Sequence, residues 1–310
     1  MAVEIKTDIC IIGAGSGGLS VAAAASQMGA ATVLIEAGKM GGDCLNYGCV
    51  PSKSLLAAGH AAQAMRDSAG FGVNGAAPGI DFARVHDHVH EVIAAIAPND
   101  SVERFEGLGV RVIQAHGRFT APDRVAAGDV VIAARRFVVA TGSRAAVPPI
   151  PGLDATPYMT NQTVFDRTTA PEQLIVIGGG PVGVELAQAH RRLGSSVTLL
   201  EMATLLGNDD PELVEVVRRR LRAEGVHIHE GVSLSGVEHR GNRIVVTAGG
   251  RSFEGSHLMI AAGRAPNIDD LGLEAAHIDH SATGIGVDAR MRTSNRRVYA
   301  IGDVIGPPML

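Results

Sequence analysis

Two cysteines separated by four residues suggest thiol–disulfide chemistry. Cys44 and Cys49 lie in the segment Gly-Gly-Asp-Cys-Leu-Asn-Tyr-Gly-Cys-Val-Pro-Ser-Lys, which ends at Lys53 and begins a predicted helix. A thiolate near a helix N-terminus and a lysine is stabilised, which makes it available for disulfide exchange. A zinc site would need two further ligands, and the third cysteine, Cys10, lies in an apolar strand where we expect it to be inert. The segment therefore predicts a redox-active cysteine pair and no metal site.

The composition favours a reducing compartment. Three cysteines in 310 residues are too few for the disulfide framework of a secreted protein. No basic segment followed by an apolar run opens the chain, and the most apolar stretch, around residues 19–35, is interrupted by polar residues and glycine. We therefore expect neither a signal peptide nor a transmembrane span, and a cytoplasmic protein. The formal net charge of −5 gives no reason to expect a nucleic-acid or membrane partner.

The glycine pattern G-x-G-x-x-G occurs twice in the chain. The glycines are Gly13, Gly15 and Gly18 in the first copy and Gly178, Gly180 and Gly183 in the second. The first glycine of such a pattern permits a tight turn, the second lets a pyrophosphate approach the backbone, and the third lets the helix pack closely. A glutamate that can accept ribose hydroxyls follows at the same distance in both copies, Glu36 (36 − 13 = 23) and Glu201 (201 − 178 = 23). The repeat predicts two dinucleotide sites, one for a tightly held flavin and one for an exchangeable nicotinamide.

Each copy is flanked by the elements of a βαβ unit: an apolar strand before it, a helix after it, and a second strand that ends in the glutamate. Further strands are predicted at residues 109–119, 130–140, 244–247, 257–261 and 298–301, and crossovers at residues 147–152 and 263–267. The class is therefore α/β, with two Rossmann-like dinucleotide-binding domains, the second inserted in the first. We expect one dinucleotide-binding domain at residues 1–150 and 269–310 and another at residues 151–268.

The order of these motifs resembles the class I pyridine nucleotide–disulfide oxidoreductase family, and most closely its dihydrolipoamide dehydrogenases. The likeness covers the whole chain, including Ala-Thr-Gly at residues 140–142, Gly-Arg-x-Pro-Asn at 263–267 and Ile-Gly-Asp at 301–303. Pro-Ser-Lys at residues 51–53 resembles the lipoamide and mercuric reductase branches, whereas glutathione reductases usually have a lysine where Ser52 stands. The resemblance implies an enzyme that passes electrons between NAD(H), FAD and the cysteine pair. It implies that the domain at residues 1–150 and 269–310 is an FAD-binding domain and that the domain at residues 151–268 is an NAD-binding domain.

The resemblance also implies roles for individual residues. Cys49 would lie nearer the flavin, and Cys44 would exchange with the substrate. Lys53 would lie near flavin N5, with Glu185 as its partner. The FAD would be lined by Gly13, Gly15, Gly18, Glu36, Lys53, Gly117, Thr141, Gly142 and Asp303, and the nicotinamide dinucleotide by Gly178, Gly180, Gly183, Glu201 and Gly263.

Glu201 also bears on the choice between NAD(H) and NADP(H). A carboxylate at this position accepts the ribose 2′-hydroxyl but repels a 2′-phosphate. No arginine occurs in residues 202–208 that could hold such a phosphate. The sequence therefore predicts NAD(H).

The chain ends at Leu310, shortly after the last predicted strand. Members of the family continue into a C-terminal dimerisation domain, which supplies a histidine–glutamate acid–base pair, and we expect that domain to be absent here. A homodimer is expected for the full-length protein, whereas we do not expect this chain to dimerise through the usual interface or to be complete for dithiol turnover. The expected substrate is a small dithiol or disulfide such as dihydrolipoamide.

Two alternatives stay open. One is a mercuric-reductase-like NAD(P)H oxidoreductase, since residues 48–53 and 185–194 also resemble that branch. The other is a truncated, non-catalytic nucleotide-binding or redox module. Retention of both cysteines and Lys53 argues against the latter, because such a module does not need a path for hydride.

Other conspicuous residues are interpreted without a chemical role. His86 and His90 lie one helical turn apart on a predicted helix, and we expect a solvated helix face, as we do for the arginine run at residues 218–222. Met202 and Met259 are predicted to be core residues.

Overall fold

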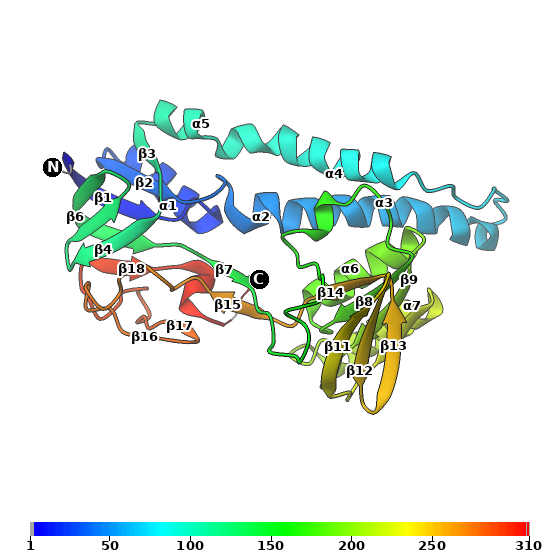
Figure 1. Cartoon of the computed structure of the whole chain (residues 1–310). Coiled ribbons are helices and arrows are strands. Elements are labelled where there is room, and N and C mark those ends of the chain that lie inside the picture. The colour runs from blue at the N-terminus through cyan, green and yellow to red at the C-terminus, as the bar shows by residue number, and fades with distance from the viewer. Residues whose placement is uncertain (1–2, 308, 310) are drawn as a thin grey trace. The chain divides into compact units, whose positions relative to one another are not determined.

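The computed structural model describes residues 3–307 and 309, which form two compact units. Unit 1 consists of Met1–Asn46, Ile93–Arg144 and Arg264–Leu310, and unit 2 of Tyr47–Val92 and Ala145–Gly263. Each unit contains one of the glycine patterns at the end of a parallel strand (Figure 1). The structure therefore has the mixed α/β architecture that the sequence predicts, with one βαβ nucleus in each unit.

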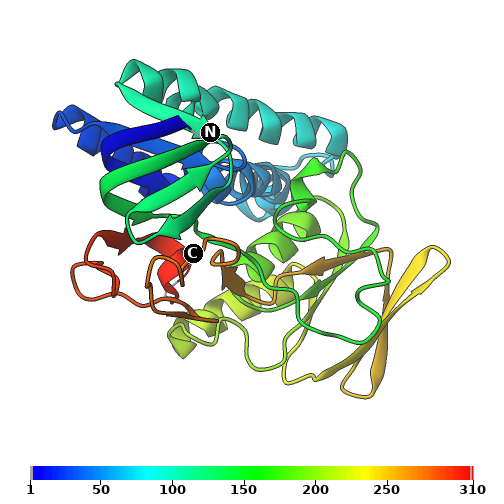
Figure 2. The same ribbon diagram turned by 60° about the vertical axis from the view of Figure 1, so that its left-hand side comes forward.

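Unit 1 is built on a seven-stranded sheet. The strands are β3 (Val110–Gln114), β2 (Thr32–Glu36), β1 (Val3–Ile12), β6 (Val130–Val139), β5 (Arg124–Ala127) and β4 (Gly117–Ala121) in that order, with β18 (Val298–Ala300) also paired to β6. Strands β1, β2, β3, β6 and β18 run parallel, whereas β4 and β5 are antiparallel additions. The turned view shows β1 lying beside β6 (Figure 2).

The parallel strands of unit 1 are apolar on both sides because both faces of the sheet are covered. Ile11 and Leu34 point into a cluster with Leu19 of helix α1 (Ser16–Gln27) and Phe105 of helix α5 (Val102–Gly107). On the opposite face, Cys10 packs in the cluster that includes Phe119 and Phe137. Burial raises the pKa of the Cys10 thiol, which confirms the prediction that it is an inert core residue.

Shorter elements complete unit 1. They are helix α2 (Gly42–Asn46), the 3₁₀ turns η2 (Ala97–Asp100) and η4 (Gly302–Ile305), and the hairpin of β16 (His280–Ser281) and β17 (Gly284–Ile285). Helix α4 (Phe82–Ile96) spans the division between the units, and β7 (Ser143–Ala145) pairs with β15 (Arg264–Pro266) where the chain passes from one unit to the other.

Unit 2 has a four-stranded parallel sheet of β10 (Val226–His229), β9 (Ser196–Leu200), β8 (Gln173–Ile177) and β14 (His257–Ile260). An antiparallel sheet of β11 (Leu234–Arg240), β12 (Arg243–Ala248) and β13 (Arg251–Gly255) shares a core with it, in which Ile175 and Ile260 contact the cluster of Val237 and Val246. The helices are α3 (Cys49–Asp67), α6 (Pro181–Arg192) and α7 (Pro211–Ala223), with 3₁₀ turns at η1 (Ser68–Phe71) and η3 (Val164–Asp166).

Three sequence predictions need correction. The single strand predicted at residues 109–119 is two strands, because β3 pairs with β2 at one end of the sheet and β4 pairs with β5 at the other. Met202 is 65% exposed, since it lies beyond the end of β9, whereas Met259 is fully buried as predicted. The face of α4 that carries His86 and His90 is not simply solvated, because the rings contact each other with centroids 4.2 Å apart and His90 bonds the Phe165 carbonyl oxygen.

Candidate functional site: two dinucleotide cradles and a thiol-bearing helix

The first glycine pattern forms a cradle at the N-terminus of α1. Gly13 has a φ of 104°, and a Cβ at Gly18 would overlap the Gly13 carbonyl oxygen, so the turn requires glycine at both positions. The carboxylate of Glu36 accepts hydrogen bonds from the Ala14 amide at 2.6 Å and the Gly38 amide at 2.7 Å. The carboxylate is thus fixed beside the glycine turn, where a ribose would lie.

The second glycine pattern repeats this geometry in unit 2. Gly178 has a φ of 111°, and a Cβ at Gly183 would overlap the Gly178 carbonyl oxygen. Glu201 accepts hydrogen bonds from the Gly179 amide at 2.6 Å and the Ala203 amide at 2.7 Å. No heavy atom lies within 4 Å of a Cβ placed at Gly180, so space for a phosphate adjoins the turn. The two units therefore present the same arrangement of turn, helix N-terminus and carboxylate.

Other predicted cofactor residues of unit 1 are joined by hydrogen bonds. Thr141 and Asn267 exchange side-chain bonds with each other's carbonyl oxygens at 2.8 and 2.9 Å. Asp303 accepts a bond of 2.5 Å from the Ser143 hydroxyl and lies 3.5 Å from the Arg264 guanidinium. These contacts join the second and third segments of unit 1.

Three predicted cofactor glycines have different surroundings. Gly142 and Gly263 have positive φ values of 68° and 114°, and a Cβ at either position would meet no heavy atom within 4 Å. Gly117 is buried, and a Cβ there would meet Ile12 and Ile35, the apolar residues at the ends of β1 and β2. Gly117 therefore supports the strands that carry the first cradle.

The two cysteines occupy consecutive helices of the chain, the short α2 and the long α3. Cys44 is partly buried in α2 of unit 1, and Cys49 is exposed as the first residue of α3 in unit 2. Within unit 1, the Asn46 amide bonds the carbonyl oxygens of Met40 and Gly42 at 3.0 and 2.9 Å, which fixes α2. Cys49 thus follows this fixed element closely in the chain and begins the next helix.

Lys53 and Glu185 form an ion pair in unit 2. The Lys53 ammonium lies 2.7 Å from a Glu185 carboxylate oxygen and 3.3 Å from the Ser52 hydroxyl. Lys53 follows Cys49 by one turn of α3, and Glu185 is on α6, the helix of the second glycine pattern. The structure therefore brings these two predicted site residues together, while their roles in catalysis stay a prediction.

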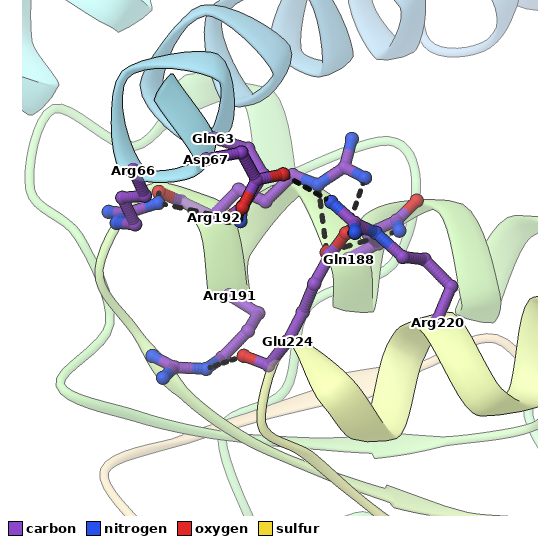
Figure 3. Close-up of polar contacts among 8 residues, drawn as sticks. All are labelled: Gln63, Arg66, Asp67, Gln188, Arg191, Arg192, Arg220 and Glu224. Atoms are coloured by element: carbon purple, nitrogen blue, oxygen red, sulfur yellow. Dashed lines mark hydrogen bonds and ion pairs between the residues drawn. The ribbon is translucent and has the colours of Figure 1, made fainter. Parts of the chain in front are cut away.

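A network around Glu224 fixes α3 against α6 and α7 (Figure 3). The Glu224 side chain, 2% exposed, accepts bonds from Arg192 Nε and Nη2 at 2.8 and 2.7 Å. Arg220 bonds both Glu224, at 2.5 Å, and Asp67 at the end of α3, at 2.8 Å. Gln188 donates a further bond of 3.1 Å to Glu224. One buried carboxylate therefore joins the C-terminal ends of three helices, of which α3 and α6 carry Lys53 and Glu185.

The sequence does not reveal this network. Arg220 is 48% exposed, as the arginine run predicts, although it is paired twice. Arg218 departs from the prediction, because it is only 16% exposed. Helical periodicity could have indicated that Arg218 is largely buried. Arg218 lies four residues after buried Val214 and three before buried Leu221, on the same face of α7. The partner carboxylates are distant in sequence, so the spacing of charges could not indicate them.

We predict that Glu224→Ala lowers the free energy of unfolding by about 3 kcal/mol, because it leaves the buried Arg192 guanidinium without a counter-charge. Burial alone would raise the pKa of Glu224, but the hydrogen bonds and charge of Arg192 and Arg220 outweigh it and lower the pKa. The pair thus stabilises the fold above pH 4.5, the carboxyl's ordinary pKa, and this contribution is lost as the pH falls through the lower folded value.

Urea denaturation at several pH values measures this effect, with Glu238→Ala as the control. Glu238 is 61% exposed and pairs only with exposed Arg240 among the contacts described, so its loss should cost less than about 1 kcal/mol. Equal effects of the two variants at neutral pH would show that Glu224 is not a structural hub.

The sequence and structure match known flavoproteins. The family model for pyridine nucleotide-disulphide oxidoreductases matches residues 7–310. The chain belongs to this family. It is 34% identical over 311 residues to the mercuric reductase of Lysinibacillus sphaericus, with 98% of this chain and 57% of the relative aligned. It is 36% identical over 314 residues to the mercuric reductase of Acidithiobacillus ferrooxidans, with 97% and 56% aligned.

A solved structure extends the comparison. The Cu(II) complex of the HOCl-induced flavoprotein disulfide reductase RclA from Escherichia coli superimposes with a TM-score of 0.87 at 28% identity. The match covers 98% of this chain and 67% of that one. The chain thus spans somewhat more than half the length of the curated relatives described here.

Pyridine nucleotide–disulfide oxidoreductases use FAD and NAD(P)H, and both cradles fit such groups. Each cradle offers a helix N-terminus to a pyrophosphate and an anchored carboxylate to a ribose. Within the described part of the chain, no three His, Cys, Asp or Glu side chains are grouped as metal ligands. Among residues 3–307 and 309, no helix has the length and apolar character needed to cross a bilayer.

Replacing Gly180 or Gly183 of the second cradle should affect dinucleotide binding and folding separately. Gly180→Ala should fold with an unchanged melting temperature, because its Cβ meets no protein atom within 4 Å, yet weaken NADH binding at least about tenfold by crowding the phosphates. Gly183→Ala should instead destabilise the fold, because its Cβ overlaps the Gly178 carbonyl oxygen. Thermal unfolding and NADH titration measure both effects; unaltered NADH affinity in Gly180→Ala would place the pyrophosphate elsewhere.

Proposed function

We propose that the chain is the electron-transfer portion of an FAD-dependent NADH:disulfide oxidoreductase, in which Cys44 and Cys49 form the redox-active pair. Unit 1 would hold FAD in its cradle, and unit 2 would hold NAD(H). The observation that carries this proposal is the Lys53–Glu185 ion pair, because it joins the helix that begins at Cys49 to the helix of the second glycine pattern. The thiol and the dinucleotide cradle are thus connected by one charged contact.

The net reaction is balanced without any further reactant. NADH gives up a hydride and the medium a proton, the S–S bond between Cys44 and Cys49 breaks, and NAD⁺ and two thiols result. Bound FAD supplies the group that accepts two electrons from one partner and gives them to the other. Exchange of the two thiols with an external disulfide would then restore the Cys44–Cys49 bond.

The chain's own residues have distinct parts in this proposal. Cys49, the first residue of α3, would lie nearer the flavin, and Cys44 would meet the external substrate, as the resemblance implies. Lys53 would place a positive charge near the reduced flavin, and Glu185 would orient it. Thr141, Gly142 and Asp303 would line the FAD, as the resemblance implies.

Dihydrolipoamide, with NAD⁺ as acceptor, remains the finer substrate prediction from the cysteine motif. A second candidate is reduction of mercuric ion, and the observation that favours it is the set of curated relatives, which carry the name mercuric reductase. The two candidates are separated by offering the full-length protein lipoamide and Hg(II) in turn with NADH. Turnover of neither would reject both.

Cys49→Ser should retain FAD but lose the thiols that NADH generates. In the wild-type chain, anaerobic NADH should convert the disulfide into thiols that react with maleimide, because the pair accepts the electrons. Cys10→Ala is the matched control, since Cys10 is fully buried and should not contribute. Maleimide labelling followed by peptide mass spectrometry measures the result; NADH-dependent labelling of Cys44 that persists in Cys49→Ser contradicts the pairing.

NADH should be preferred to NADPH by at least about tenfold in kcat/KM with ferricyanide as acceptor, because the Glu201 carboxylate is anchored beside the ribose position. Glu201→Ser should reduce this preference by removing the repulsion of a 2′-phosphate. Equal efficiency with both dinucleotides in the wild-type chain would reject the NAD(H) assignment.

A further inference from the structure

The segment that follows Glu201 is attached to the end of β10 through one carboxylate. Glu230, directly after β10, accepts hydrogen bonds from the Thr204 hydroxyl at 3.1 Å and from the Leu205 amide at 2.8 Å. Because Glu201 also bonds the Ala203 amide, residues 203–205 are held by two carboxylates. This segment borders the position where the ribose 2′-oxygen of a bound dinucleotide would lie.

Arg218 of α7 is a cation that contacts this segment. Its Nη2 lies 3.4 Å from the Thr204 hydroxyl, whereas residues 202–208 themselves contain no lysine or arginine. The same guanidinium donates two bonds of 2.9 Å to Glu230, one from Nε and one from Nη2. Its Nη1 donates a third bond, of 2.6 Å, to Glu215. Two carboxylates therefore hold Arg218 in place.

The carboxylates that bind Arg218 neutralise its positive charge. Burial alone would raise the pKa of Glu230, but the bonds from Arg218, Leu205 and Thr204 outweigh it and lower the pKa, so Glu230 is ionised at neutral pH. A two-pronged bond between a guanidinium and a carboxylate is strong and directional. A 2′-phosphate needs a guanidinium or ammonium group of its own, and here the guanidinium that contacts Thr204 is already bound to Glu230. Arg222, whose Nη2 lies 3.7 Å from the same carboxylate, is also paired with Glu230.

We propose that Glu230 is a specificity-determining residue for the dinucleotide, because it withholds Arg218 from a ribose 2′-phosphate. Glu201 repels that phosphate directly, and Glu230 removes the cation that could compensate for the repulsion. This inference rests on the proposed binding of NAD(H) by unit 2. It assigns a role to an ion pair that is absent from the glycine pattern and lies more than twenty residues beyond it in the sequence.

Binding of two small adenosine compounds to the FAD-loaded chain, in which the flavin occupies the first cradle, tests the proposal without catalysis. Isothermal titration calorimetry would measure the affinity of the purified chain for AMP and for adenosine 2′,5′-bisphosphate. The wild-type chain should bind AMP more tightly. Glu230→Gln keeps the oxygen that accepts the Leu205 and Thr204 bonds but removes the negative charge, so the bisphosphate-to-AMP affinity ratio should rise about tenfold.

Two further variants act as controls. Glu215→Gln removes the other carboxylate on Arg218 but leaves the two-pronged bond to Glu230, so the ratio should change less than about twofold. In the double variant Glu230→Gln/Arg218→Gln the ratio should return to the wild-type value, because the released cation is gone. Circular dichroism establishes that each variant is folded. If Glu230→Gln does not fold, Glu230→Asp, which shortens the carboxylate and weakens the pair, should give a smaller increase of about threefold.

The outcomes are distinct. A bisphosphate-to-AMP ratio in Glu230→Gln that stays within twofold of the wild-type value overturns the role of Glu230. So does a raised ratio that persists when Arg218 is also replaced. If AMP, NADH and the bisphosphate all fail to bind the wild-type chain, the proposed NAD(H) site in unit 2 is itself wrong, and the inference falls with it.

Discussion

The structure depends on a close backbone contact that occurs once in each unit. The third glycine of each pattern, Gly18 or Gly183, faces the carbonyl oxygen of the first with no room for a Cβ. This contact sets the start of α1 and α6 directly against the strand before it, so the amides of each helix N-terminus face the turn. The glutamate at the end of the next strand then reaches the same turn and is held by two amides.

The second cradle also fixes the position of Lys53 on α3. Because α6 begins at the glycine turn, Glu185 has a defined position one turn along that helix, and Lys53 is held 2.7 Å from it. At the other end of the helices, Glu224 binds Arg192 of α6 and, through Arg220, Asp67 of α3. The helix that begins at Cys49 is therefore attached to the cradle helix by ionic contacts near both of its ends.

Much of this could be predicted from sequence, because the relevant constraints are local. Each glycine pattern, its flanking apolar strands and its glutamate lie within about thirty residues of one another. The sequence alone therefore reveals both cradles. Family membership, the α/β class and the FAD and NAD(P)H requirement are confirmed by the family match. The Lys53–Glu185 contact is implied by the resemblance and could not be derived from spacing, since the two residues are far apart in the chain.

The sequence misleads where a charge has a distant partner. Arg218 belongs to a run that suggests a solvated face, yet it is only 16% exposed and is paired with Glu230. Arg220 of the same run is exposed as predicted, but its partners Glu224 and Asp67 could not be predicted from the run. Hydrophobicity alone predicts that Met202 is a core residue, but it follows a strand end and is exposed. Such contacts depend on how the helices of unit 2 pack, which local patterns do not specify.

The central claim is that the cysteine pair and the flavin form one electron path, and an anaerobic dithionite titration of the FAD-bound chain tests it most directly. A flavin and a disulfide each accept two electrons, so the account predicts the uptake of about two equivalents of dithionite per FAD. The Cys49→Ser chain should take up about one equivalent, because only the flavin can then be reduced. Uptake of one equivalent by the wild-type chain, fully oxidised beforehand, would contradict the account.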